Sequence, residues 1–137
     1  MIGIVIVSHG QLGDALIDAA EFILGEKLPA IAAVSIDLNE SVDKLRAKIT
    51  GGLKAVDQKA GVLILTDMFG GTPSNLSYSF LEEGRIEVVS GVNLPILIRA
   101  ASARKSQPLT ELAANIEAFG KKSISMASGI LKGNKRG

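Results

Sequence analysis

The chain has 137 residues, of which 47% are hydrophobic and 21% are charged, and its formal net charge is +1. These values fit one compact domain over residues 1–131, followed by a basic tail at residues 132–137 that we expect to be flexible. Lys132, Lys135 and Arg136 lie in this tail without any acidic residue, so the body is slightly acidic, which argues against a nucleic-acid-binding protein.

The sequence also excludes several kinds of site. It contains no cysteine, so a disulfide framework, a thiolate nucleophile and a zinc–thiolate site are ruled out. No apolar run approaches the roughly 20 residues that a membrane span requires, and the N-terminus lacks the features of a signal peptide. We therefore expect a cytoplasmic protein that does not insert into a membrane.

The chain opens with a strand, a helix and a second strand. Residues 2–7 are a short, apolar and β-branched run, which predicts a buried strand of a parallel sheet. Apolar residues at helical spacing predict a helix over residues 12–23, which Gly25 can end. Residues 30–36 are again apolar and predict a second strand.

A second helix and a third strand follow in the same alternation. The apolar spacing predicts the helix over residues 42–56, although Gly51 and Gly52 inside it should weaken or kink it. Residues 61–67 are almost wholly apolar up to Asp67, which predicts another buried strand.

The loop after this strand leads into a third helix. Thr72 followed by Pro73 is a start signal, with threonine as the N-cap and proline as the first helical residue. We expect this helix to be short and to end at Gly84.

The last third of the chain contains one more apolar strand. It is expected over residues 86–89, and helices are expected over residues 95–103 and 108–119. Residues 123–127 alternate between polar and apolar, which suggests a late antiparallel edge strand with one face in water.

This alternation of strands and helices predicts an α/β fold. Four apolar strands joined by helices form a doubly wound parallel sheet with helices on both faces. We expect the strand order 2-1-3-4, which places the first and third strands side by side. Their carboxyl ends carry His9 and Asp67, and ligands bind at this edge of open α/β sheets.

His9, the only histidine, is the strongest candidate for a reactive group. A carboxylate bonded to one ring nitrogen fixes the tautomer and leaves the lone pair of the other nitrogen free. That arrangement suits attack on phosphorus, metal binding or general-base catalysis. Each residue alone also has a purely structural interpretation, with His9 in the core and Asp67 capping a turn.

The glycines beside these residues favour an anion among the possible ligands. Gly70 and Gly71 allow close approach of backbone N–H groups, and Thr72 adds a hydroxyl at the start of a helix. Gly10 precedes a second helix start, so a phosphoryl group on His9 would lie between two sets of donors.

Other sites fit the sequence less well. Residues 8–13 miss the dinucleotide-binding fingerprint because serine replaces its first glycine. A response-regulator receiver needs acidic residues after the first strand, where this chain has Ser8 and His9. The nucleophile elbow and the P-loop are absent, and one histidine without cysteine disfavours a metal site.

Three motifs resemble the enzyme IIA domain of the mannose family of the phosphoenolpyruvate:sugar phosphotransferase system. They are Ile4-Val5-Ile6-Val7-Ser8-His9-Gly10, Thr66-Asp67-Met68-Phe69-Gly70-Gly71-Thr72-Pro73-Ser74-Asn75 and Gly91-Val92-Asn93-Leu94-Pro95. The likeness extends from Met1 to about Phe119. A related subunit of dihydroxyacetone kinase is an alternative that lacks the Gly-Gly-Thr-Pro loop.

The resemblance implies a phosphohistidine carrier. His9 would accept a phosphoryl group from the carrier protein HPr and pass it to a separate enzyme IIB, with Asp67 orienting His9. The region of Gly71 and Thr72 would hold phosphoryl oxygens, and neither a metal nor an organic cofactor is implied.

The resemblance also implies a homodimer that exchanges a late strand, for which residues 123–127 are the candidate. A regulatory module, in which phosphorylation of His9 controls a partner without sugar transport, would have the same site and remains an alternative.

Overall fold

The computed structural model describes residues 1–133, so residues 134–137 of the expected tail lie outside the described residues. The strands are β1 (Gly3–His9), β2 (Ile31–Ile36), β3 (Val62–Thr66) and β4 (Ile86–Ser90). The helices are α1 (Leu12–Leu24), α2 (Val42–Val56), α3 (Thr72–Tyr78), α4 (Leu94–Ala103), α5 (Leu109–Lys122) and α6 (Ala127–Gly133).

The four strands form one sheet in the order β2-β1-β3-β4, which confirms the predicted topology. All three strand pairs are parallel. Because β1 is central and pairs with β3 up to the register Val7–Thr66, the residues that follow each strand emerge at the same edge of the sheet.

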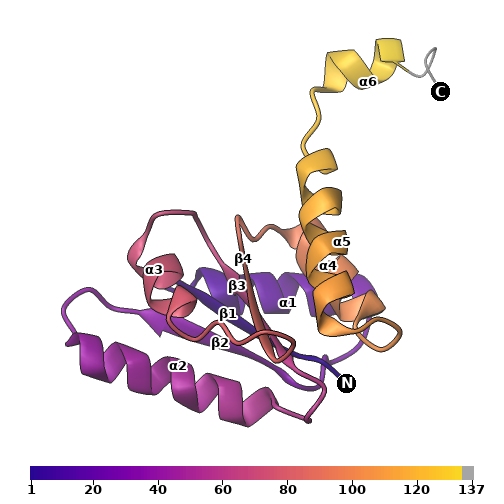
Figure 1. Cartoon of the computed structure of the whole chain (residues 1–137). Helices are drawn as coiled ribbons and strands as arrows, with labels where there is room; N and C mark the ends of the chain where they lie inside the picture. The colour runs from indigo at the N-terminus through magenta and orange to yellow at the C-terminus, as the bar shows by residue number, and fades with distance from the viewer. Residues whose placement is uncertain (134–137) are drawn as a thin grey trace.

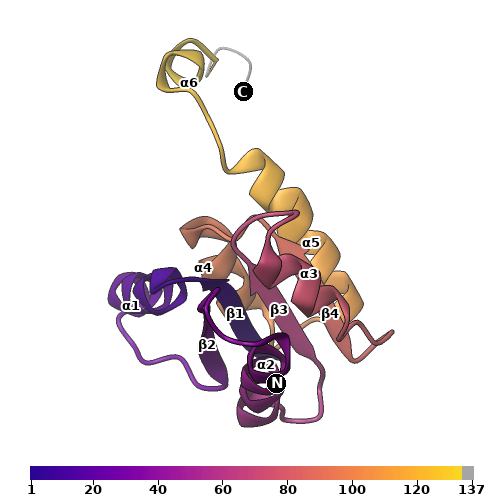
Figure 2. The same cartoon turned by 90° about the vertical axis from the view of Figure 1, so that its left-hand side faces the viewer.

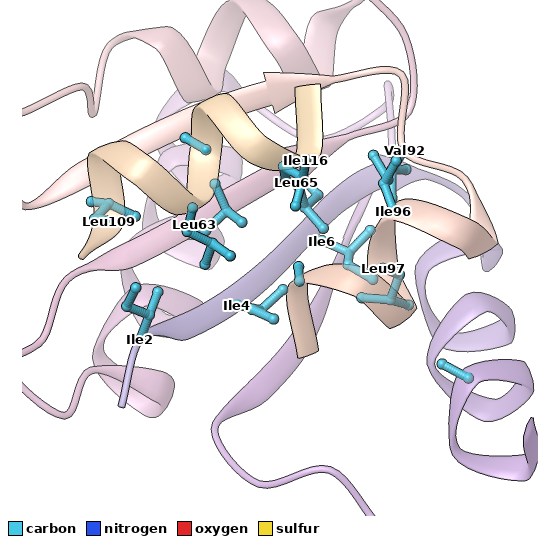
Figure 3. Packing of buried hydrophobic residues seen from close by; sticks show 14 residues of the cluster. Ile2, Ile4, Ile6, Leu63, Leu65, Val92, Ile96, Leu97, Leu109 and Ile116 are labelled. Carbon is cyan, nitrogen blue, oxygen red and sulfur yellow. The ribbon is translucent and has the colours of Figure 1, made fainter. Parts of the chain in front are cut away.

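Alternate residues of the central strands pack against two different helix layers. Ile4, Ile6, Leu63 and Leu65 face α1, α4 and α5, and this cluster appears in Figure 3. The intervening residues, such as Val5 and Ile64, face α2 on the other side. Figures 1 and 2 show α2 on one face of the sheet and α4 and α5 on the other. The central strands β1 and β3 are apolar at nearly every position because both of their faces are covered.

A buried arginine at the end of α4 forms hydrogen bonds with the residues that precede β1 and β2. Arg104, only 2% exposed, donates hydrogen bonds to the carbonyl oxygens of Ile2, Pro29 and Ala30. Burial lowers the pKa of this guanidinium below its ordinary value. These hydrogen bonds lie at the end of the sheet opposite to His9. They hold the backbone just before β1 and β2 in place.

Both ends of α3 differ from the prediction. The N-cap of α3 is Gly71 rather than Thr72, which is already the first helical residue. Gly71 has the extended conformation of a cap, with φ −84° and ψ 168°. The helix ends at Tyr78, well before Gly84, because the chain then turns and Glu82 forms an antiparallel bridge with Ile86.

The expected late strand is also wrong for the single chain. Residues 123–126 leave the end of α5 without pairing to any strand among residues 1–133, and α6 begins at Ala127. Both views show α6 standing away from the body. In the part of the chain that the structure describes, this segment pairs with no strand, and an isolated strand is unstable in water.

The glycine pair in α2 neither breaks nor ends the helix, which runs unbroken from Val42 to Val56. Gly52 packs against the sheet, where an added Cβ would lie 2.9 Å from Val34 Cγ2 and 3.3 Å from Val5 Cγ1. An added Cβ on Gly51 would meet no atom within 4 Å. The first glycine is therefore exposed, whereas the second allows α2 to approach the sheet closely.

These neighbours should respond to alanine in opposite directions. Gly51→Ala should raise the free energy of unfolding by about 0.5–1 kcal/mol, because alanine favours the helix and meets open space. Gly52→Ala should lower it by about 1–3 kcal/mol, because Val34 must shift to admit the methyl group. Urea denaturation of both variants measures the difference. Equal effects of the two substitutions would contradict this account of the helix contact.

Candidate functional site

His9 and Asp67 meet at the carboxyl edge of the sheet. His9 is the last residue of β1, and Asp67 directly follows β3. Oδ2 of Asp67 lies 2.6 Å from Nδ1 of the His9 ring. The same oxygen accepts a hydrogen bond of 2.9 Å from the backbone N–H of His9. Asp67 thus fixes both the main chain and the ring of a residue 58 positions away.

The two side chains differ in their access to water. The His9 side chain is 42% exposed and the Asp67 side chain 10%. Because Nδ1 faces the carboxylate, the opposite nitrogen, Nε2, is the one left for an incoming group; no hydrogen bond to Nε2 is found within residues 1–133. The carboxylate lies on the Nδ1 side of the ring, and Nε2 lies on the opposite side.

The environment of Asp67 favours the ionised carboxylate. Burial by itself raises its pKa, but hydrogen bonds from the His9 backbone and ring, together with the charge of a protonated His9, outweigh burial. The pKa of Asp67 is therefore below its usual value. The carboxylate remains ionised at neutral pH and is suited to stabilise a positively charged imidazole.

Glycines form the remaining side of the site. An added Cβ on Gly71 would lie 3.4 Å from Cε1 of His9, so the Gly71 backbone is close to the ring. Gly10 and Gly70 both have positive φ, of 55° and 84°. This left-handed conformation favours glycine and lets each loop turn sharply next to the ring.

The predicted site residues are therefore brought to one edge, with different degrees of contact. His9, Asp67 and Gly71 lie close together, whereas Gly10 and Gly70 shape the two loops. Thr72 begins α3, and its hydroxyl makes no hydrogen bond within the described part of the chain. No group of three His, Asp or Glu side chains that could hold a metal ion occurs in residues 1–133.

The sequence analysis missed the polar side chains beneath the site. Ser8, 1% exposed, accepts a hydrogen bond of 3.1 Å from the N–H of Gly13 and so fixes the start of α1. A second group of hydroxyls lies behind the Asp67 loop and consists of Thr66, Ser74, Tyr78 and Ser90. Four positions spread over three structural elements form no local motif, so no sequence pattern reveals this group.

Comparisons with known proteins point to one family. Residues 3–117 match the family model EIIA-man, described as PTS system fructose IIA component. The chain is 36% identical over 129 residues to the PTS system fructose-specific EIIA component of Bacillus subtilis, covering 93% of this chain and 88% of that protein. It is 34% identical over 108 residues to the PTS system mannose-specific EIIAB component of Escherichia coli, covering 78% of this chain and 33% of that protein.

A solved structure agrees with these matches. The crystal structure of phosphotransferase system component EIIA from Streptococcus agalactiae has a TM-score of 0.82 to this chain at 26% identity. The likeness covers 93% of this chain and 98% of that chain. None of the helices in residues 1–133 combines the length and the apolar character needed to cross a membrane.

Replacing Asp67 with asparagine should destabilise the fold in a pH-dependent way. The pKa of Asp67 is lower when folded, so its carboxylate stabilises the protein above the ordinary carboxyl pKa of about 4. That contribution is lost as pH falls through the folded-state pKa. At pH 7 the free energy of unfolding of the wild type, measured with urea, should exceed that of Asp67→Asn by about 1 kcal/mol. This difference should shrink in acid.

Asp37→Asn is the matched control, since Asp37 lies at the same sheet edge but accepts its hydrogen bond from the exposed Asn39 N–H. If the stability difference between wild type and Asp67→Asn grew toward acid, the ionised Asp67 carboxylate would not be what stabilises the fold.

Proposed function

Because the chain belongs to the EIIA-man family of the sugar phosphotransferase system, we propose that it carries a phosphoryl group on Nε2 of His9. The donor is phospho-HPr and the acceptor an enzyme IIB, and the exchange takes place in the cytoplasm. The observation that carries this proposal is the 2.6 Å contact of Nδ1 with Asp67, which leaves Nε2 free on a half-exposed ring.

The proposed transfer uses the phosphohistidine of the donor, His9 and the residues around His9. The lone pair of Nε2 attacks phosphorus, and a new N–P bond forms as the N–P bond of the donor breaks. The electron pair of the broken bond returns to the donor's imidazole. Phosphorylated His9 carries positive charge on its ring, which the ionised Asp67 stabilises through Nδ1–H. Transfer to enzyme IIB repeats the same displacement with His9 as the leaving group.

The glycine loops are suited to hold the phosphoryl oxygens. Backbone N–H groups of Gly10, Gly70 and Gly71 and the hydroxyl of Thr72 are the proposed donors. This role follows from the closeness of Gly71 to the ring and from the sharp turns at Gly10 and Gly70. Donors already in position stabilise the charge of a loose phosphoryl-transfer transition state without reorganising.

The surface near His9 offers apolar contacts to protein partners. Leu12, Met68 and Phe69 are 44%, 55% and 79% exposed, and they lie in or next to the loops that carry His9 and Asp67. A donor that brings its phosphohistidine to Nε2 must cover these side chains, because they border the same edge. Large exposed apolar groups are typical of surfaces that bind other proteins.

Phosphoryl transfer is tested from phosphoenolpyruvate through enzyme I and HPr to this chain. We expect one acid-labile phosphoryl group on His9, no labelling of His9→Gln, and slower labelling of Asp67→Asn with an intact fold. Asp37→Asn, which keeps Asp67 and His9 unchanged, should be labelled at the wild-type rate. Labelling that persists in His9→Gln would refute the assignment of the phosphoryl acceptor.

We also propose a homodimer in which residues 123–127 of one copy pair with β4 of the other. The outer edge of β4 has no neighbouring strand among the described residues. A cavity of about 440 Å³ lies along it, between residues 88–91 and the last turns of α5. Ile124 and Met126 are 82% and 73% exposed in the single chain, so exchange would cover both the strand edge and these side chains.

Removal of the exchanged segment should produce a monomer. A chain that ends at Ser123 keeps all of α5 and its C-cap, so the His9 site should remain folded. Removal of residues 134–137 alone is the control and should leave the dimer intact. Sedimentation velocity measures both variants. A full-length protein that is monomeric at high concentration, or a dimer that survives truncation at Ser123, would show the exchange to be wrong.

A further inference from the structure

A group of buried hydroxyls lies directly behind the loop that connects Asp67 to α3. Thr66 and Ser74 are fully buried, and their hydroxyl oxygens are 2.6 Å apart. Ser90 Oγ lies 2.9 Å from the Thr66 hydroxyl and 3.1 Å from that of Ser74. Tyr78 OH lies 3.0 Å from Ser90 Oγ. We call these four residues, which join β3, α3 and β4, the hydroxyl cluster.

One contact leads from the hydroxyl cluster to the loop. Ser74 Oγ donates a hydrogen bond to the carbonyl oxygen of Met68, the residue after Asp67. A serine hydroxyl has a single hydrogen, so Ser74 can only accept hydrogen bonds from the cluster. The Thr66 hydroxyl donates to Ser90, so the hydrogen bond that Ser74 accepts comes from Ser90. A hydroxyl that accepts hydrogen bonds becomes a stronger donor. The cluster as a whole therefore strengthens the one bond that holds the Met68 peptide.

The position of this peptide determines the geometry around the ring. Met68 lies between Asp67, which holds Nδ1, and Gly71, which lies against Cε1. An added Cβ on Gly71 would also be only 3.3 Å from Cγ of Met68, so Gly71 lies against both the Met68 side chain and the His9 ring. A shift of the Met68 peptide would move the carboxylate and the Gly71 backbone relative to His9.

Ser77 provides a comparison within the same helix. It is as fully buried as Ser74, but its hydroxyl donates to Pro73 O at 2.6 Å, inside α3 itself. Serine in a helix commonly makes this local bond. Ser77 thus satisfies its own hydroxyl, whereas Ser74 uses its hydroxyl to hold the loop.

We propose that Ser74 is a positioning residue for phosphoryl transfer, and that the hydroxyl cluster acts through it to hold the Asp67–Gly71 loop against His9. This inference rests on the proposed function of His9. Ser74 is buried and touches neither reactant, so its removal should slow the chemical step far more than it weakens donor binding.

The test compares Ser74→Ala with Ser77→Ala in single-turnover transfer from phospho-HPr over a range of donor concentrations. In Ser74→Ala we expect the maximal rate to fall roughly tenfold to a hundredfold, the effect of a small misplacement of reacting groups. The half-saturating donor concentration should change by a much smaller factor than the maximal rate, since Ser74 is buried and its hydroxyl makes no contact that a donor protein could replace. Ser77→Ala should match wild type in both quantities.

Amide hydrogen exchange of the unphosphorylated protein gives a second readout that requires no donor. Residues 69–71 should exchange faster in Ser74→Ala and at the wild-type rate in Ser77→Ala. Tyr78→Phe removes only the outermost hydroxyl, and it should cause a smaller loss of maximal rate in the same direction.

The outcomes separate the two proposals. Absence of His9 labelling in wild type overturns the proposed function and the positioning role with it. Labelling of wild type with an unchanged rate and unchanged exchange in Ser74→Ala overturns the positioning role alone. An equal loss in Ser77→Ala also overturns it, because the effect would then belong to any buried serine of α3.

Discussion

The site depends on a single oxygen atom, Oδ2 of Asp67. It accepts one hydrogen bond from the backbone of His9 and contacts Nδ1 of its ring, so it fixes the end of β1 and the ring at once. Both bonds require β1 and β3 to be adjacent and in register, and the parallel pairing supplies this. The rest of the fold keeps these two strand ends in place, from the helix layers on both faces to Arg104 at the opposite end.

Sequence patterns predicted the strands and their order because the physical signal is strong there. A strand buried on both faces is apolar at nearly every position, as β1 and β3 are, and four apolar runs separated by helices permit few topologies. His9 and Asp67 were placed at strand ends by the same argument, and the structure brings them into contact. Their chemical roles stay a prediction, since geometry shows the contact and not the reaction.

The expectations that failed depend on tertiary contacts that local patterns do not contain. Gly51 and Gly52 were expected to weaken or kink α2, which runs unbroken, and the contact that Gly52 allows with Val34 is invisible in the sequence of the helix alone. The segment 123–127 has the alternation of an edge strand, but it has no strand to pair with among residues 1–133. The N-cap of α3 fell on Gly71 because backbone conformation, not the threonine hydroxyl, begins that helix. The hydroxyl cluster was unpredictable, since its members meet only after folding.

If His9 carries a phosphoryl group as proposed, the exposure of its ring limits how long that group stays there. A side chain that is 42% exposed is open to a protein donor, to a protein acceptor and to water alike. Burial could not protect the adduct without also closing the site to both proteins. In the proposed carrier, the fraction of phosphoryl groups delivered therefore depends on the rate of encounter with the acceptor relative to the rate of hydrolysis. Abundance of the acceptor then governs the yield of transfer as directly as the chemistry at His9 does.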